Sequence, residues 1–403
     1  MEQTYFRKGF GLKDEIEGAL TADYHSRVVE AIRERGYALT AGDLTIRLAR
    51  EFGFCYGVDR AVEYAYEART KFPDRRTLLV GEIIHNPHVN SKLRAMGVEF
   101  LFRASDGAFD FSAVTSGDVV ILPAFGVTVH DFERLRQIGC VLVDTTCGSV
   151  LNVWKRVESY ARDGYTAVIH GKFFHEETKA TASQVTKFPR GKYIIVRHMD
   201  EAKLVCAYIE GQGDREALLQ SFAHACSPEF DPDTDLVKVG VANQTTMLSN
   251  ESLAIAQELG ASMARRWGEA EVAGHFRTFD TICSATQDRQ DAVLKLIAEP
   301  LDVMVVIGGY NSSNTTHLAA ICAATVPTYH IEDAQCIDPE SGSIRFLPVG
   351  KREEERRDHW LPAGRITLGI TAGASTPNNK IGETVERIAA TRGTTLDAAL
   401  AGS

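Results

Sequence analysis

Short β-branched apolar runs alternate with longer amphipathic segments from about residue 44 to the end of the chain. Apolar runs of this length are typical of strands buried on both faces, and apolar residues at spacings of three and four are typical of helices that pack on a sheet. The alternation therefore predicts an α/β fold of βα units around mostly parallel sheets. The clearest strands are predicted at residues 45–48, 78–80, 119–122, 141–143, 167–169, 237–241, 303–307 and 366–370. Helices are predicted at residues 58–68, 246–259, 287–298, 317–323 and 381–390.

The same pattern divides the chain into an N-terminal extension and three small α/β domains. Residues 1–43 form the extension, with one amphipathic helix near residues 24–33 that is closed by Gly36. The domains are expected at residues 44–147, 148–279 and 280–403. Polar or charge-rich stretches near residues 200–235 and 333–363 are interpreted as insertions in the second and third domains. The charged run at residues 351–358 is more simply explained as solvated surface than as a binding patch.

Composition narrows the class of protein without indicating a function. Hydrophobic residues make up 44% of the 403 residues and charged residues 24%, which is ordinary for a folded soluble protein. A net charge of −10 argues against sequence-independent binding of nucleic acid. No apolar run is long enough to span a membrane, and residues 1–14 lack the apolar core of a signal peptide. We therefore expect a cytoplasmic protein that binds neither nucleic acid nor membrane, whose eight cysteines are not a disulfide framework.

Three of the cysteines share one setting, in which a strand ends and a helix begins within a few residues. They are Cys55 in G-F-C-Y-G, Cys147 in D-T-T-C and Cys283 in D-T-I-C, the last two being near copies. The free N–H groups and dipole of a helix N-terminus stabilise a thiolate, which is the form that binds iron. Three such thiolates would hold a 4Fe-4S cluster and leave one iron open to a ligand.

The alternative is that each cysteine is a buried apolar residue, which is the commoner role of an isolated cysteine. We favour that interpretation for the five cysteines that lack the shared setting. These are Cys140, Cys206, Cys226, Cys322 and Cys336. The sequence contains no C-x-x-C, so a zinc ribbon or a local ferredoxin motif is excluded.

Hydroxyl and amide side chains follow two of the predicted strands. Ser312, Ser313 and Asn314 follow the strand at 303–307, and Ser375 follows the strand at 366–370. Small hydrogen-bond donors at a helix start form a natural phosphate site. The same residues would also serve as ordinary helix caps, and the sequence leaves both interpretations open.

Two histidines, a glutamate and two threonines lie in equivalent turns. His85 and His175 can donate to phosphate when protonated, and Glu177 next to an open iron could relay protons. Thr245 and Thr246 lie between a strand and a helix. Taken singly, the histidines and Glu177 are more often structural surface residues, and the threonines are more often helix caps.

Taken together and in order, these motifs resemble the 4-hydroxy-3-methylbut-2-enyl diphosphate reductase family. They are G-F-C-Y-G-V-D-R-A, E-I-I-H-N, D-T-T-C, H-E-E-T, N-Q-T-T-M-L-S, D-T-I-C-S-A-T-Q-D-R-Q, N-S-S-N-T and T-A-G-A-S-T-P. The resemblance implies a trefoil of three α/β domains around one 4Fe-4S cluster held by Cys55, Cys147 and Cys283. It implies that the substrate's hydroxyl binds the open iron, with Thr245 orienting it and Glu177 delivering protons. The diphosphate contacts that it implies are His85, His175, Thr245, Ser312, Ser313, Asn314 and Ser375.

The resemblance also implies the overall reaction. Two electrons and two protons expel water and give isopentenyl and dimethylallyl diphosphates, the last step of the methylerythritol phosphate route to isoprenoids. Ferredoxin or flavodoxin would supply the electrons, because the chain has no flavin or nicotinamide fingerprint.

The chain departs from the family pattern at two turns. Phe125 stands where many members have a diphosphate-binding histidine, and His130, about one helical turn further on, is the nearest substitute in sequence. The turn after Cys147 also lacks a proline that is common there. Phe125 and the N-terminal extension resemble the cyanobacterial and plant branch of the family.

Two other functions are compatible with such a cluster. An iron-sulfur dehydratase or a quinolinate-synthase-like enzyme would use the open iron as a Lewis acid and would need no external electrons. A cluster-based redox sensor would have no turnover and would leave Glu177 and Thr245 without a purpose.

Overall fold

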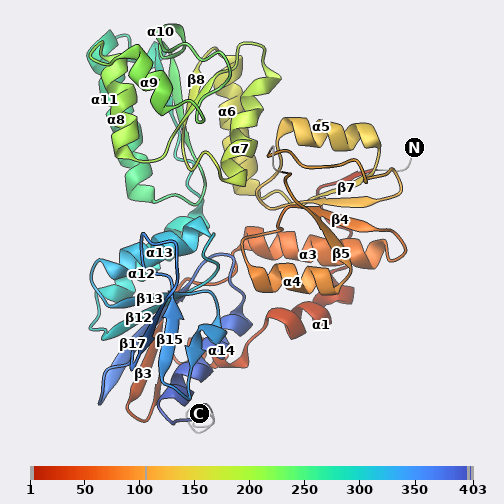
Figure 1. The fold of residues 1–403 in the computed structure, drawn as a ribbon, viewed down its shortest axis with the longest axis vertical. Coiled ribbons are helices and arrows are strands. Elements are labelled where there is room, and N and C mark those ends of the chain that lie inside the picture. Colours follow the sequence, from red (N-terminus) through yellow and green to blue (C-terminus); the bar gives the residue numbers. More distant parts are fainter. Residues whose placement is uncertain (1–3, 105–106, 397–399, 401–403) are drawn as a thin grey trace. The chain divides into compact units, whose positions relative to one another are not determined.

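The computed structural model describes residues 4–104, 107–396 and 400, which form two compact units. Unit 1 comprises Met1–Lys8, Phe72–Ile83 and Val98–Cys283. Unit 2 comprises Gly9–Lys71, Ile84–Gly97 and Ser284–Ser403. Figure 1 labels the elements of both units in chain order.

Unit 1 contains two parallel sheets. The first has the order β1-β7-β6-β4-β5. Its strands are Tyr5–Phe6 (β1), Thr77–Val80 (β4), Val98–Leu101 (β5), Val119–Leu122 (β6) and Val141–Asp144 (β7). The second has the order β11-β10-β8-β9. Its strands are Thr166–His170 (β8), Tyr193–Val196 (β9), Val239–Asn243 (β10) and Phe276–Thr278 (β11).

Helices cover both faces of the second sheet of unit 1. The helices of this unit are Val129–Ile138 (α5), Gly148–Arg162 (α6), Glu176–Ser183 (α7), Met199–Ile209 (α8), Arg215–Ser221 (α9), Pro232–Asp235 (α10) and Ser249–Trp267 (α11). Figure 1 shows α8 and α11 on one side of β8, with α6 and α7 on the other. The residues predicted as a polar insertion at 200–235 thus include α8, which buries Val205 and Ile209 in the core of this unit.

Unit 2 is built on a five-stranded sheet with the order β13-β12-β17-β3-β2. The strands are Ala38–Ala41 (β2), Leu44–Leu48 (β3), Val303–Ile307 (β12), Thr328–Ile331 (β13) and Ile366–Ala372 (β17), and only the β2–β3 pair is antiparallel. The helices are Lys13–Tyr24 (α1), Arg27–Glu34 (α2), Tyr56–Lys71 (α3), Pro87–Ala95 (α4), Ser284–Ile297 (α12), Ser313–Ala323 (α13) and Asn378–Thr391 (α14).

The pleat of β12 explains why its sequence is apolar throughout. Val303, Val305 and Ile307 belong to the core that includes α2 and α14. Met304 and Val306 belong to the core that includes α12 and α13. Because successive side chains of a strand point to opposite faces, a strand covered by helices on both sides has no polar face. The predicted α/β class with mostly parallel sheets is confirmed.

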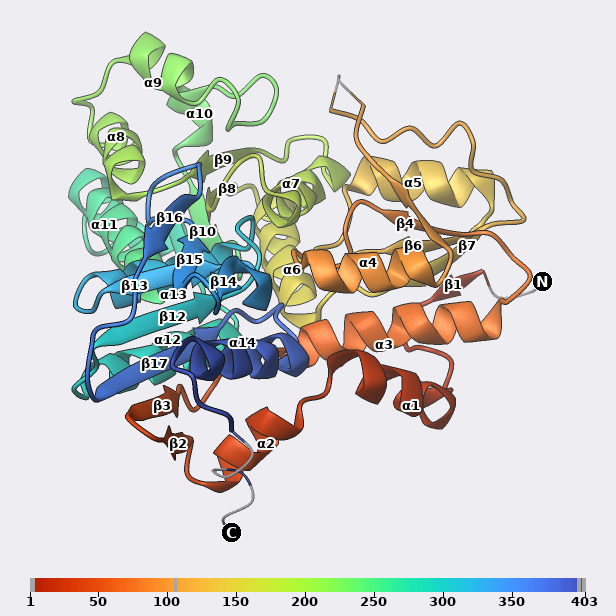
Figure 2. The ribbon, with the colours of Figure 1, turned by 60° about the horizontal axis from the view of Figure 1, so that its bottom comes forward.

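The insertion at residues 333–363 forms a small antiparallel sheet of Ile337–Asp338 (β14), Ser343–Phe346 (β15) and Glu355–Asp358 (β16). Figure 2 shows it beside β13. Ile337 and Ile344 are fully buried in the core that also contains Ile307. Residues 351–358 are exposed, as predicted for a solvated charged run.

The N-terminal extension differs from its prediction. It contains two strands, β1 and β2, and two helices, α1 and α2, rather than one helix at residues 24–33. Ser26 separates the helices by capping α2, because its hydroxyl accepts a hydrogen bond from the Val29 N–H at 3.3 Å. The strand at Leu44–Leu48 pairs with β17, so it lies in the same sheet as β12 and not in the sheet of β4, with which it was grouped. The predicted domain boundaries themselves stay a prediction.

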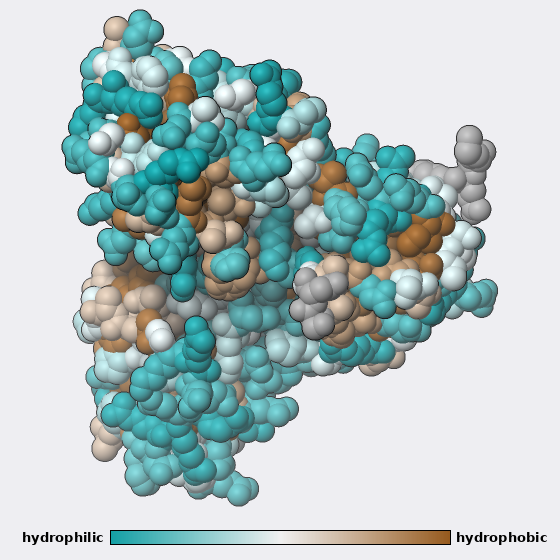
Figure 3. Space-filling view, turned by 45° about the horizontal axis from the view of Figure 1, so that its top comes forward, coloured by the Kyte–Doolittle hydropathy of each residue, from teal (hydrophilic) through white to brown (hydrophobic). Residues whose placement is uncertain are grey.

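No helix among the described residues has both the length and the apolar content needed to cross a membrane. Figure 3 shows a face on which hydrophilic residues predominate and hydrophobic residues occur in small separate groups.

Candidate active site

The three cysteines with the shared sequence setting also share a backbone geometry. Each lies directly before a helix: Cys55 before α3, Cys147 as the N-cap of α6, and Cys283 before α12. Each is a half-buried reduced thiol. In each case the cysteine N–H donates to a carbonyl oxygen in the loop after a neighbouring strand. The pairs are Cys55 with Ala374 at 3.2 Å, Cys147 with Ala124 at 3.0 Å, and Cys283 with Thr245 at 3.4 Å.

The near-identical motifs D-T-T-C and D-T-I-C form the same turn. The Thr146 N–H donates to Oδ1 of Asp144 at 3.0 Å, and the Ile282 N–H donates to Oδ1 of Asp280 at 3.0 Å. In both turns an aspartate side chain accepts from the backbone two residues on and so shapes the chain just before the cysteine. The repeat seen in the sequence is therefore a repeat of local structure.

The N-terminal extension holds the first of these aspartates. The Tyr5 hydroxyl donates to Oδ2 of Asp144 at 2.6 Å, and Nε of Arg7 lies 3.4 Å from the same oxygen. The strand β1 brings both residues there by pairing with β7. Asp144 thus uses one oxygen for the turn and the other for the extension.

A buried arginine holds the loop before Cys55. Arg289, on α12, donates from Nη2 to the carbonyl oxygens of Gly53 at 2.6 Å and Phe54 at 3.1 Å. Sequence reasoning did not single out this residue, although it lies in the quoted motif D-T-I-C-S-A-T-Q-D-R-Q. A buried arginine that satisfies several carbonyl oxygens is typical of a loop that must keep one conformation.

The remaining cysteines differ from these three. Cys140, Cys206, Cys322 and Cys336 are buried. Burial raises the pKa of Cys140 and Cys206 to about 11 and that of Cys322 to about 12, so these thiols stay protonated. Cys226 is half-buried, and burial raises its pKa as well. These properties agree with the expected structural role.

Glu177 and Thr245 meet in the interior of unit 1. Glu177 lies in the first turn of α7 with 1% of its surface exposed. The Thr245 N–H donates to Oε1 at 2.6 Å, and the Thr245 hydroxyl donates to Oε2 at 3.0 Å. Burial raises the pKa of Glu177 to about 7, against these two hydrogen bonds, which lower it. A carboxyl group with such a pKa can both hold and release a proton near neutral pH.

His175 caps the same helix and is oriented by it. Its Nδ1 accepts a hydrogen bond from the Glu177 N–H at 3.1 Å, so in the neutral ring the proton is on Nε2. The ring of Phe125 lies edge-on against that of His175, with the ring centroids 5.6 Å apart. Phe125 therefore contributes an apolar contact to this turn, and His130 is an exposed residue of α5.

In unit 2, His85 and Ser375, two of the predicted phosphate contacts, are hydrogen-bonded to each other. The Ser375 hydroxyl donates to the carbonyl oxygen of His85 at 3.2 Å, and Nδ2 of Asn311 lies 3.3 Å from Nδ1 of His85. Ser312 is the N-cap of α13, which begins with Ser313 and Asn314. Asn311 was not singled out, although it lies in the quoted motif N-S-S-N-T.

Asn314 has an unsatisfied donor in this loop. Its Oδ1 accepts from the Ala374 N–H at 3.0 Å. Its Nδ2 is buried and has no hydrogen-bond partner in the part of the chain that the structure describes. Because an unpaired buried donor is costly, this atom fits a site for an acceptor such as a phosphate oxygen.

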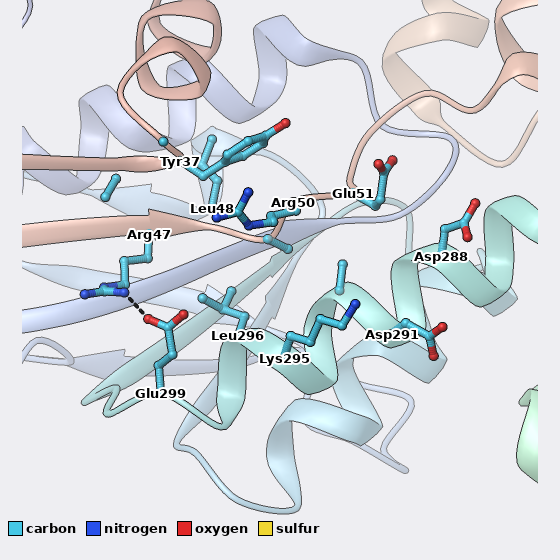
Figure 4. Close-up of a pocket in the computed structure, with 14 residues that line it drawn as sticks. Tyr37, Arg47, Leu48, Arg50, Glu51, Asp288, Asp291, Lys295, Leu296 and Glu299 are labelled. Atoms are coloured by element: carbon cyan, nitrogen blue, oxygen red, sulfur yellow. Dashed lines mark hydrogen bonds and ion pairs between the residues drawn. The ribbon is translucent and has the colours of Figure 1, made fainter.

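A different cavity of unit 2 contains none of the predicted site residues. It lies between the β2–β3 hairpin and α12, as Figure 4 shows. Its volume is about 480 Å³. Arg47 and Glu299 form an ion pair there, and Arg50 lies over the Tyr37 ring at 5.4 Å. Because none of the predicted site residues lines this cavity, we assign it no ligand. Within each unit, the described residues include no group of three His, Cys, Asp or Glu side chains that could hold a metal ion.

Comparison with known proteins identifies relatives over nearly the whole chain. The family model described as "LytB protein" matches residues 46–389. A protein of Thermosynechococcus vestitus named 4-hydroxy-3-methylbut-2-enyl diphosphate reductase is 50% identical over 391 residues, which cover 97% of this chain and 95% of the relative. A protein of Synechococcus sp. (strain RCC307) with the same name is 49% identical over 387 residues, covering 96% and 93%.

Two solved structures are similar to this one. A structure of (E)-4-hydroxy-3-methyl-but-2-enyl diphosphate reductase, described as the terminal enzyme of the non-mevalonate pathway, has a TM-score of 0.51 at 29% identity, covering 85% of this chain and 98% of that chain. The structure of E-1-hydroxy-2-methyl-but-2-enyl-4-diphosphate reductase from Plasmodium falciparum has a TM-score of 0.61 at 22% identity, covering 84% and 86%. At that identity the second structure supports the fold alone.

Proposed function

The chain belongs to the LytB protein family, and from this premise we propose that it reduces (E)-4-hydroxy-3-methylbut-2-enyl diphosphate to isopentenyl and dimethylallyl diphosphates. The resemblance drawn from the motifs is thereby confirmed at the level of the family. The observation that carries the proposal is the buried Glu177–Thr245 pair, because a carboxyl group with a pKa of about 7 suits proton delivery. Per substrate molecule, two electrons and two protons are consumed, the C–O bond to the hydroxyl breaks, and water leaves.

We assign Cys55, Cys147 and Cys283 as the ligands of one 4Fe-4S cluster with an open iron. Their common position before a helix and their common N–H to carbonyl bond support this, since the donor set is three thiols with matching environments. Cysteine thiolates are the usual protein ligands of iron-sulfur clusters. When bound, the cluster would supply electrons and a Lewis-acidic site for the substrate hydroxyl.

We assign binding of the diphosphate to polar residues that follow strand ends. The proposed contacts are His85, His175, Thr245, Ser312, Ser313, Asn314 and Ser375. The unsatisfied Nδ2 of Asn314 and the Nε2–H of His175 are donors suited to phosphate oxygens. Phe125 offers no such donor, so this site has one fewer histidine than the usual family pattern.

We assign proton delivery to Glu177 and orientation of the substrate hydroxyl to Thr245. Protonated Glu177 can donate to a leaving hydroxyl, which turns a poor leaving group into water. Thr245 holds both carboxyl oxygens, so it fixes the direction in which the proton is presented.

We further propose a ferredoxin or a flavodoxin as electron donor, because the sequence has no flavin or nicotinamide fingerprint. A cytoplasmic location, and the lack of any nucleic-acid or membrane partner, stay predictions from composition.

Turnover by the reconstituted protein tests the proposal. The holoprotein, reconstituted with iron and sulfide without oxygen, is given the hydroxymethylbutenyl diphosphate and a strong one-electron donor. We expect isopentenyl and dimethylallyl diphosphates in the product mixture by chromatography, and none from Glu177→Gln with the cluster intact. Absence of both products from the wild-type protein with a full cluster would contradict the proposal. A product that has lost the elements of water, and that forms without the electron donor, would favour a dehydratase.

A further inference from the structure

Tyr310 connects the turn after β12 to the inserted sheet. It lies two residues before Ser312, the N-cap of α13. Its hydroxyl donates to Oε1 of Glu354 at 2.7 Å and lies 3.8 Å from Sγ of Cys336. Both partners belong to residues 333–363, which we call the strap.

Glu354 is fixed from its other side. Nη1 of Arg345, on β15, donates to Oε2 of Glu354 at 3.0 Å. The pairing of β15 with β16 places Phe346 opposite Glu355, so Glu354, which directly precedes β16, is held near the end of β15 that carries Arg345. Each oxygen of the Glu354 carboxylate therefore accepts one hydrogen bond, from the Tyr310 hydroxyl and from the Arg345 guanidinium. These two bonds favour a single rotamer of Glu354.

The strap is joined to the main sheet of unit 2 at His330. The Leu347 N–H donates to the carbonyl oxygen of His330 at 2.8 Å. The His330 ring lies edge-on against Tyr310 at 5.1 Å, and its Nε2 is 3.0 Å from the carbonyl oxygen of Gly308. Burial lowers the pKa of His330 to about 4, so the ring is neutral near pH 7. Because a carbonyl only accepts, Nε2 carries the proton and donates to Gly308.

The residues on either side of Tyr310 contact the proposed diphosphate site. A Cβ on Gly309 would lie 2.8 Å from the carbonyl oxygen of His85, so the backbone must approach His85 closely here. Asn311 contacts the His85 ring. In this short turn, Tyr310 is therefore hydrogen-bonded to the strap, and its neighbours Gly309 and Asn311 contact His85.

We propose that the strap positions the diphosphate-binding turn, with Tyr310 and Glu354 as the positioning residues. The inference rests on the proposed function, because it takes His85, Ser312 and Asn314 as diphosphate contacts. The diphosphate is unchanged by the reaction, so a better-held turn stabilises the bound substrate and the transition state equally. Loss of the Tyr310–Glu354 bond therefore weakens binding without slowing the chemical step.

Substitutions at the two ends of this bond test the proposal on the reconstituted holoprotein. We expect Tyr310→Phe to raise KM about three- to tenfold with kcat unchanged. This is less than the full loss of a hydrogen bond to a charged group, because the bond acts on the substrate only through the position of the turn. Glu354→Ala gives the same rise, and Glu354→Gln a smaller one because its amide oxygen still accepts. In titration calorimetry with inorganic pyrophosphate, we expect the Kd of these variants to rise by the same factors relative to the wild type.

The control is Glu355→Gln, which removes a neighbouring carboxylate that pairs with Lys351 on the surface of the strap. We expect it to bind pyrophosphate as the wild type does. Wild-type affinity in both Tyr310→Phe and Glu354→Ala overturns the proposal, as does an equal loss in Glu355→Gln. The proposed reaction and the role of the strap can fail separately. If the wild-type protein makes no isoprenoid diphosphate but both variants bind pyrophosphate more weakly than it does, the reaction is refuted and the role of the strap is supported.

Discussion

Replacement of Thr245 by valine should change the pH range in which the protein is active. Valine keeps the shape of threonine and removes the hydroxyl that donates to Oε2 of Glu177 at 3.0 Å. That hydrogen bond stabilises the charged carboxylate, and bonds to charged groups contribute about 1.5–3 kcal/mol. Since a tenfold change in an acid constant corresponds to about 1.4 kcal/mol, the loss favours the protonated form of Glu177 by at least about tenfold.

The sign follows from the role of Glu177 as a proton donor. Its pKa of about 7 means that the active, protonated form is lost as the pH rises through neutrality. In Thr245→Val the fall in kcat should therefore lie about one pH unit higher than in the wild type. The Thr245 N–H still donates to Oε1, so the site keeps its other hydrogen bond.

The assay is kcat against pH with saturating substrate and reductant. A drop in overall rate is expected too, because Thr245 is a proposed substrate contact, but only the midpoint of the profile tests this reasoning. Thr246→Val is the matched control, since the Thr246 hydroxyl contacts Gln244. A midpoint that stays in place or moves to lower pH in Thr245→Val would refute the account of Glu177.

Three further outcomes are expected. Burial raises the Glu177 pKa from 4.5 to about 7, so the wild-type protein should lose stability as the pH rises from 4.5 to 7. Glu177→Gln should lose less stability over this range, and an equal fall in melting temperature with pH in the two proteins would contradict this. Gly126→Ala places a Cβ 2.4 Å from Trp154 at a φ of +75° and should cost about 1–3 kcal/mol more by denaturant unfolding than Gly97→Ala, which has a similar φ and open space. Cys147→Ala should lower the iron bound per chain after reconstitution, and unchanged iron would remove it from the ligand set.

Much of the fold was predictable because the signals are local. A strand such as Val303–Ile307 is buried on both faces, so its sequence is apolar throughout, and the helices after it carry the matching periodicity. The same holds for the site residues at strand ends, since Cys147 and Ser312 cap helices that the sequence itself indicates. The repeat D-T-x-C also forms its turn from its own side chain and backbone.

The contacts between distant segments could not be predicted. Leu44–Leu48 was grouped with the strands that follow it in sequence, but it pairs with Ile366–Ala372, because a parallel strand can join any sheet edge that its apolar faces fit. Strand β1 is only two residues long, too short for a pattern, and its pairing with β7 is what brings Tyr5 to Asp144.

The sequence alone determined which residues could do chemistry here: thiols, hydroxyls, two histidines, an asparagine and one glutamate between strands and helices. Only the tertiary structure decided their properties. Glu177 is an ordinary surface-type residue by composition. Burial raises its pKa to about 7, against the hydrogen bonds from Thr245, 68 positions away, which lower it. Solvent exposure and long-range hydrogen bonds set the free energy of a charge, and neither is encoded within a few residues of the group that carries it.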